Sequence, residues 1–159
     1  MITLTPAEER LRDFLIDRAA CAAEPPGTYG ALMAGFDPDN STGLNQANSY
    51  FPRLSTALYH VNLSELDRRR PMVGALAVVN TRSSIKGFAG VGRERDLLDG
   101  DSPEEERAFW QDQRDRAIQH WSAAKAEAGD GHTLPDAQFD AIMGELSKIK
   151  QMLRQLLHG

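Results

Sequence analysis

The densest group of residues that could do chemistry is a run of carboxylates. It comprises Asp99, Asp101, Glu104, Glu105 and Glu106. Carboxylate oxygens are common ligands of divalent metal ions, so the run raises the question of a metal site. Glu105, however, follows Ser102 by three residues with a proline between them, which is the capping box of a helix start. We therefore predict a solvated helix start, with no metal site and no cofactor.

Nucleophiles and histidines form no catalytic pattern in this chain. The single cysteine, Cys21, has no C-x-x-C partner, and the four histidines are scattered along the sequence. His60 lacks a recognisable serine, cysteine or aspartate partner, and the glycines of GFAGVG at 87–92 lack the context of a dinucleotide-binding loop. We therefore expect a protein that is not an enzyme, and a small nuclease or hydrolase ranks last among the alternatives.

Basic residues are concentrated in the middle of the chain. Cations outnumber acids over residues 45–96, although the whole chain carries a net charge of −5. Arginine and lysine contact phosphates, and asparagine and glutamine amides can read adenine edges. The candidates for such contacts are Asn45, Gln46, Asn48, Arg68, Arg69, Arg70, Arg82 and Lys86. The alternative is that the arginines stabilise a helix end and the amides occupy a solvated loop.

Helix starts are marked by capping residues. Thr5 and Ser102 each precede a proline and stand three residues before a glutamate, and Thr28 stands before a short apolar stretch. Trp110 and Trp121 lie at helical spacing, which favours a place in the core over a base-stacking role. The expected helices run from about 6 to 22, from Thr28 over a short stretch, over 44–51, over 52–70 and over 103–125.

Residues 72–92 have the pattern of a β-hairpin. MVGALAVV at 72–79 predicts a strand, NTRSSIKG at 80–87 a loop, and GFAGVG at 87–92 a short returning strand. Three helices followed by a hairpin is the element order of a winged helix. We therefore expect a mainly α chain with a small β-hairpin, in which residues 1–126 form a winged-helix-like domain.

Part of this order resembles a known family. The motif T-Y-G-x-L at Thr28–Leu32, the proline-led stretch RPMVGALAVVN at 70–80 and the following G-F are similar to the DNA-binding domain of methylguanine-DNA methyltransferases and alkyltransferase-like proteins. The resemblance covers about residues 28–90. It implies that Tyr29 lies near a target phosphate and that Arg53 lies on the helix that supplies an intercalating arginine.

The chain departs from that family at the reactive motif. The family has proline, cysteine or tryptophan, histidine and arginine where this chain has Pro71-Met72-Val73-Gly74, so no alkyl-accepting thiol is present. The wider pattern also resembles a family of small uncharacterised bacterial and phage proteins, which implies no activity.

The C-terminal segment carries a heptad repeat. After a glycine-containing linker at 127–133, apolar residues alternate at spacings of three and four. These residues are Phe139, Leu146 and Leu153 at position a and Ile142, Ile149 and Leu156 at position d. Leucine at a with isoleucine at d favours trimers or tetramers in parallel coiled coils. We predict an oligomerisation helix over 134–158; the alternative is that it packs on its own domain.

Together these patterns predict a cytoplasmic, non-enzymatic DNA-binding protein that acts as a homo-oligomer, for example a regulator or architectural factor of a phage or mobile element. No apolar run is long enough to span a membrane, and the N-terminus lacks the pattern of a secretory signal. The alternative is an adaptor in a bacterial or phage assembly whose core domain docks a protein partner.

Overall fold

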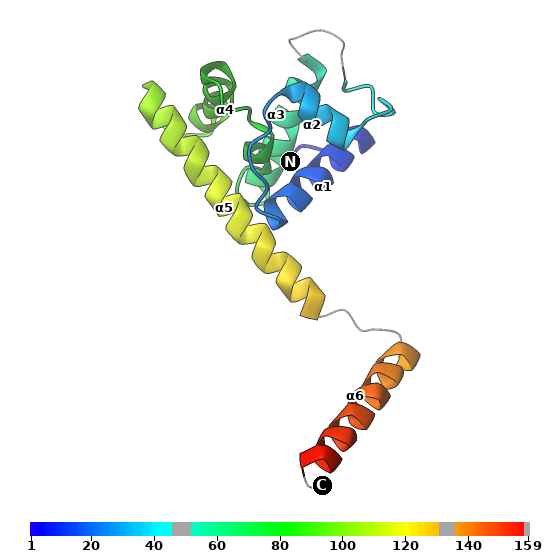
Figure 1. Cartoon of the computed structure of the whole chain (residues 1–159). Coiled ribbons are helices and arrows are strands. Elements are labelled where there is room, and N and C mark those ends of the chain that lie inside the picture. The colour runs from blue at the N-terminus through cyan, green and yellow to red at the C-terminus, as the bar shows by residue number, and fades with distance from the viewer. Residues whose placement is uncertain (46–51, 131–135, 158–159) are drawn as a thin grey trace. The chain divides into compact units, whose positions relative to one another are not determined.

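The computed structural model describes residues 1–45, 52–130 and 136–157 (Figure 1). Its elements are α1 (Pro6–Ala20), α2 (Tyr29–Phe36), α3 (Pro52–Asp67), the 3-10 helix η1 (Val73–Ala77), α4 (Arg82–Glu94), α5 (Pro103–Asp130) and α6 (Asp136–Leu157). The chain divides into two compact units, Met1–Lys125 and Ala126–Gly159.

Three predicted helix starts are confirmed by their hydrogen bonds. The Thr5 hydroxyl accepts from the Glu8 amide at 3.3 Å, and the Thr5 amide donates to the Glu8 carboxylate at 2.7 Å. Ser102 and Glu105 form the same reciprocal pair, and Thr28 accepts from the Ala31 amide. These bonds satisfy amide groups that have no partner inside the helix.

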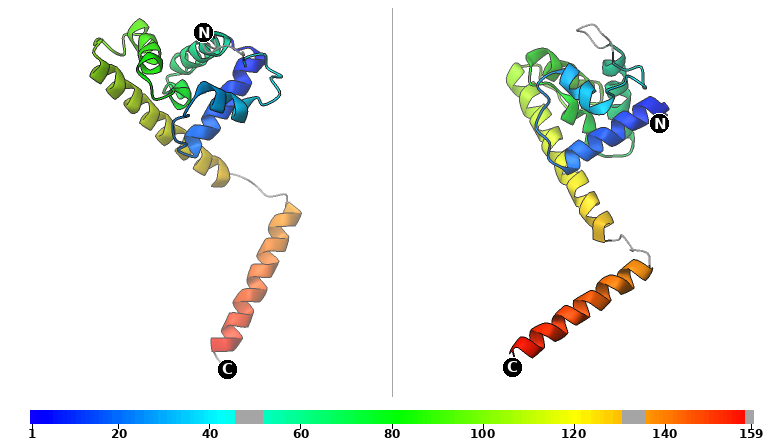
Figure 2. Two further views of the ribbon diagram at one scale, coloured as in Figure 1. Left: turned by 45° about the horizontal axis from the view of Figure 1, so that its top comes forward. Right: turned by 45° about the vertical axis from the view of Figure 1, so that its right-hand side comes forward.

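The short helix η1 lies at the centre of the first unit, and all of its residues are buried. Its polar backbone groups are bonded by side chains from three surrounding helices. The Asn62 carboxamide of α3 accepts from the Gly74 amide at 2.9 Å, Trp110 of α5 donates to the Ala75 carbonyl at 3.1 Å, and Arg18 of α1 donates to the Leu76 carbonyl at 3.3 Å. Buried backbone groups need such partners, so α1, α3 and α5 enclose η1 (Figure 2).

The predicted β-hairpin is wrong. Over the described residues the chain contains no strand, and the segment expected to form the hairpin is η1 followed by α4. The predicted winged helix is wrong for the same reason, because the wing of that fold is a pair of strands. The coarser prediction of a mainly α chain is confirmed.

The error has a physical cause in each half of the segment. Residues 72–79 are all buried, and a continuous apolar run of this length does not distinguish a strand from a buried helical turn. In α4, Thr81 caps the helix, and Ile85, Phe88, Ala89 and Gly92 are buried at helical spacing. The glycines of GFAGVG favour strand and loop by their type, but in α4 Gly87 and Gly90 have open space beside them and Gly92 lies against Phe109.

The end of α5 also differs from the prediction. The helix continues to Asp130, so residues 127–130, expected in a linker, are helical. Alanine and glutamate in this stretch favour helix, which outweighs its one glycine. Of the helix expected over 44–51, Leu44 and Asn45 are not helical, and residues 46–51 lie outside the described part of the chain.

Candidate functional sites

The predicted basic residues lie in two places. Arg68, Arg69 and Arg70 follow the end of α3, and Arg95 beside the end of α4 pairs with Asp67 at 3.5 Å, so the two helix ends lie together. Arg82 is the first residue of α4 and Lys86 stands one turn later. Since a helix rises about 1.5 Å per residue, Arg82 lies about 18 Å along α4 from its far end. The structure therefore does not gather the two groups into one patch.

Arg68 and Arg70 are held by a buried carboxylate. Glu65 is fully buried, and its oxygens pair with Arg12 of α1, with Arg68 at 3.6 Å and with Arg70 at 3.9 Å. A buried charge is tolerated only where it is paired and hydrogen-bonded. In the fold, Arg68 and Arg70 therefore balance the charge of the buried Glu65 carboxylate.

Trp121 joins the same cluster. The guanidinium groups of Arg12 and Arg70 lie 5.6 and 5.4 Å from the centre of its ring, a distance at which cations are attracted to the face of an indole. Trp110 is buried in the core. The preference for core packing over base stacking is therefore confirmed for Trp110, while Trp121 packs at the edge of the core between arginines.

The remaining predicted nucleic-acid residues each have a different setting. Arg69 is exposed in the left-handed backbone region, with φ of 58°. Arg53 is exposed at the start of α3 and donates to the Gly43 carbonyl, and the backbone amide of Asn45 donates to Asn40. Tyr29 donates to Ser84 of α4 at 3.1 Å. Gln46 and Asn48 lie outside the described residues.

Two members of the carboxylate run have a role within the fold. Glu105 completes the capping box of α5, and hydrogen bonds from Ser102 lower its pKa. Glu106 is buried and accepts from Arg93 at 2.8 Å. Within the described ranges, no three His, Cys, Asp or Glu side chains are grouped so that they could hold a metal ion.

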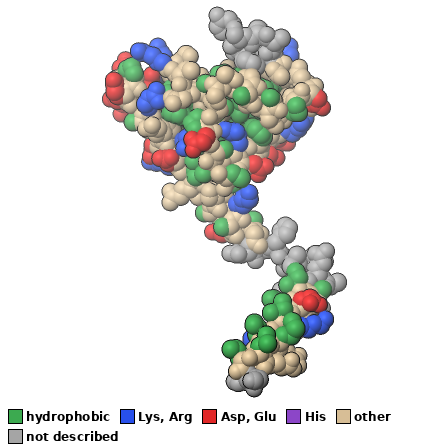
Figure 3. Space-filling view, viewed as in Figure 1, with side chains coloured by type: hydrophobic (Ala, Val, Ile, Leu, Met, Phe, Trp, Pro, Cys, Tyr) green, Lys and Arg blue, Asp and Glu red, His purple; other side chains and the backbone are tan. Residues whose placement is uncertain are grey.

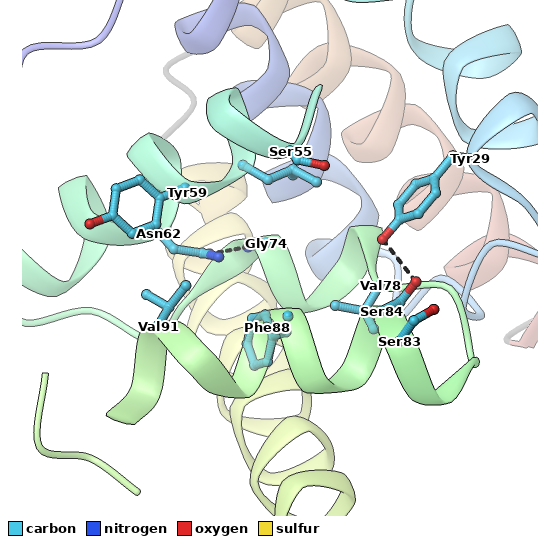
Figure 4. A pocket seen from close by; sticks show the side chains of 12 residues that line it. Tyr29, Ser55, Tyr59, Asn62, Gly74, Val78, Ser83, Ser84, Phe88 and Val91 are labelled. Carbon is cyan, nitrogen blue, oxygen red and sulfur yellow. Dashed lines mark hydrogen bonds between the residues drawn. The ribbon is translucent and has the colours of Figure 1, made fainter. Parts of the chain in front are cut away.

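A cleft of about 380 Å³ opens between α3 and α4, with η1 at its floor and Tyr29 of α2 at one end (Figure 4). Its walls are apolar, and its rim carries hydroxyl groups from α3 and α4. Nothing in the sequence pattern predicted it, because its residues come from four separate segments. The small residues Ser83, Ser84 and Gly87 line the cleft on the α4 side, but small residues in a sequence do not by themselves predict a cleft.

The second candidate site is the apolar face of α6. Its large apolar side chains from Ile142 to Leu157 are between 47% and 80% exposed, and Figure 3 shows them in green along the helix. Of the six predicted seam residues, Ile142, Leu146, Ile149, Leu153 and Leu156 have described, exposed side chains. Phe139 lies within α6, but its side chain is outside the described part.

Comparisons with protein-family models, with curated proteins and with solved structures found no match for this chain. The resemblance to the methyltransferase DNA-binding domain therefore stays a prediction. None of the described helices has both the length and the apolar character needed to cross a lipid bilayer.

Proposed function

We propose that the protein is a non-enzymatic interaction protein that self-associates through α6 and presents several copies of its helical domain to a protein partner. The exposed apolar face of α6 carries this proposal. A contiguous apolar stripe on a helix is costly in water and is typical of a surface that another helix covers.

The spacing of the stripe favours a second copy of α6 as that cover. Its residues recur every 3.5 positions on average, the repeat that lets helices wrap around one another over their whole length. Glu145 falls at position g and Lys150 at position e of the next heptad, a spacing at which parallel neighbours form ion pairs. Ion pairs between Glu145 of one helix and Lys150 of the next therefore favour a parallel arrangement of the α6 helices.

Self-association would give the helical domain avidity. When weak binding modules are linked, the second contact becomes intramolecular, and overall binding strengthens without any new contact in a single module. Most of the stability of a helix in a protein comes from packing of its apolar face, so the order of α6 and the assembly of chains are expected to be coupled.

The experiment replaces Leu146 and Leu153 with aspartate in the full chain and measures mass by light scattering. Burying these charges in the seam is unfavourable, so the variant is expected to be monomeric. The matched control, Ser147→Asp with Gln151→Asp, adds the same charge at positions b and f and should keep the assembly. A double Leu variant that remains assembled would contradict the proposal.

DNA binding by the same oligomer is a second candidate, and it does not require a wing. It is favoured by Arg82 and Lys86, which are both exposed and stand one helical turn apart on α4. Exposed cations at this spacing can contact neighbouring phosphates.

Replacing Arg82 and Lys86 with alanine tests this candidate. If both contact phosphate, affinity should fall on all sequences and the slope of log affinity against log salt should flatten by about one unit per lost contact. Unchanged affinity and slope in the double variant, or no DNA binding by the intact chain, would leave the protein-partner proposal alone.

A further inference from the structure

The cleft between α3 and α4 has the size of a small-molecule site. Its volume of about 380 Å³ lies in the range of ligand pockets. Leu58, Val78, Phe88 and Val91 form apolar walls, and none of the residues that line it is charged. Removing a charged ligand from water is unfavourable where no opposite charge receives it, so an occupant of this cleft should be neutral.

Asn62 gives the cleft a directed hydrogen-bond donor. The residue is only 3% exposed. Its oxygen accepts from the Gly74 amide at 2.9 Å, which fixes the orientation of the carboxamide. A Cβ at position 74 would collide with this side chain, so glycine there allows the close approach.

The amide nitrogen of Asn62 has no partner among the described residues, and Asn62 lines the cleft. This nitrogen is not one of the side-chain atoms that are closed off from solvent without a partner, so a water or ligand atom in the cleft can reach it. The nitrogen can therefore donate to an acceptor atom that enters the cleft, in whose wall Asn62 lies beside Gly74 (Figure 4).

The rim supplies further polar contacts at a distance from Asn62. Ser55 of α3 and Ser83 and Ser84 of α4 contribute hydroxyl groups. Tyr59 lines the wall, and its phenol donates to Glu94 at 2.6 Å. Gly87 leaves a gap in the α4 wall, because nothing lies within 4 Å of the position a Cβ would take.

We propose that this cleft binds a small uncharged molecule built on one flat ring that bears a carbonyl group. The ring lies against the Phe88 and Leu58 side chains, and the carbonyl oxygen accepts from the Asn62 amide. Polar substituents on the far edge of the ring meet the serine hydroxyls. The proposal is independent of α6 and of self-association.

Saturation-transfer difference NMR on the full chain tests the proposal, with benzamide as the probe and benzoate as its charged counterpart. Benzamide should give saturable transfer, and benzoate should bind at least about tenfold more weakly. Absence of saturable transfer to benzamide, or equal binding of the two probes, would overturn the proposal.

Variants locate the binding. Gly87→Leu should fill the cleft and weaken benzamide binding at least about tenfold. Gly90→Leu is the matched control, because Gly90 lies on the same helix with equal space but does not line the cleft. Its benzamide binding should equal that of the unaltered chain.

Asn62→Asp tests the donor directly. It keeps the oxygen that accepts from Gly74 and removes the amide group, so benzamide binding should be lost while the circular dichroism spectrum stays helical. Retained binding in Gly87→Leu or in a folded Asn62→Asp would overturn the assignment of the cleft.

Discussion

At the scale of single residues, the partner of each arginine decides what it can do. Arg68 and Arg70 belong to a basic run in the sequence, yet in the fold they surround Glu65 together with Arg12. Arg12 and Glu65 are separated by 53 positions, so no local pattern could reveal their contact. Arg82 and Lys86, which have no such buried partner among the described contacts, remain the exposed cations of α4.

Asp37 is a second residue whose role only the fold reveals. It is fully buried at the end of α2 and accepts from the amides and hydroxyls of Ser41 and Thr42. Burial alone would raise the pKa of its carboxyl group. The hydrogen bonds from Thr42 and Ser41 outweigh burial and hold that pKa well below its ordinary value.

This pKa gives a pH-dependent prediction. A carboxylate with a lowered folded pKa adds stability above its unfolded pKa, and that stability is lost as pH falls through the folded value. Asp37→Asn should therefore lower the free energy of unfolding at about pH 7, and the difference from the unaltered chain should shrink toward about pH 2. Urea denaturation of both chains at several pH values measures this difference in the free energy of unfolding. A difference that is constant with pH would contradict the assigned role.

At the scale of elements, the sequence predicted helices where a cap marks the start and failed where burial is continuous. Thr5, Thr28 and Ser102 signal their helices through bonds within three residues. Residues 72–79 are buried on all sides, so they show no periodicity that separates strand from helix. Thr81 caps α4, but the glycines at 87, 90 and 92 are poor helix formers, so the sequence of this stretch favours loop and strand.

Substitutions at two of these glycines test α4 as a helix. Gly90 has open space for a Cβ, so Gly90→Ala should raise the free energy of unfolding by about 0.5–1 kcal/mol through helix propensity. Gly92 faces the Phe109 ring, and Gly92→Ala should lower the free energy of unfolding by about 1–3 kcal/mol through overpacking.

Denaturant unfolding of both variants gives the comparison. Opposite signs at positions two residues apart are the signature of one exposed and one buried helix face. The same sign at both positions, or no gain for Gly90→Ala, would count against the helix.

At the scale of the whole molecule, the chain combines a unit with a buried core and a unit in which every described side chain is exposed. Residues 1–125 enclose η1, whereas the described side chains of α6 are all exposed. The heptad repeat made α6 predictable, because its period is local. The cleft was not predictable, because α2, α3, η1 and α4 form it only after folding.

Sedimentation equilibrium of the intact chain tests the central claim, self-association through α6, most directly. One chain has a mass of 17.6 kDa, and the heptad pattern predicts an assembly of three or four chains. A version that ends at Gly131 should sediment as a single chain with a helical spectrum. An intact chain that stays at 17.6 kDa at every concentration, or a truncated chain that keeps the assembly, would contradict the claim.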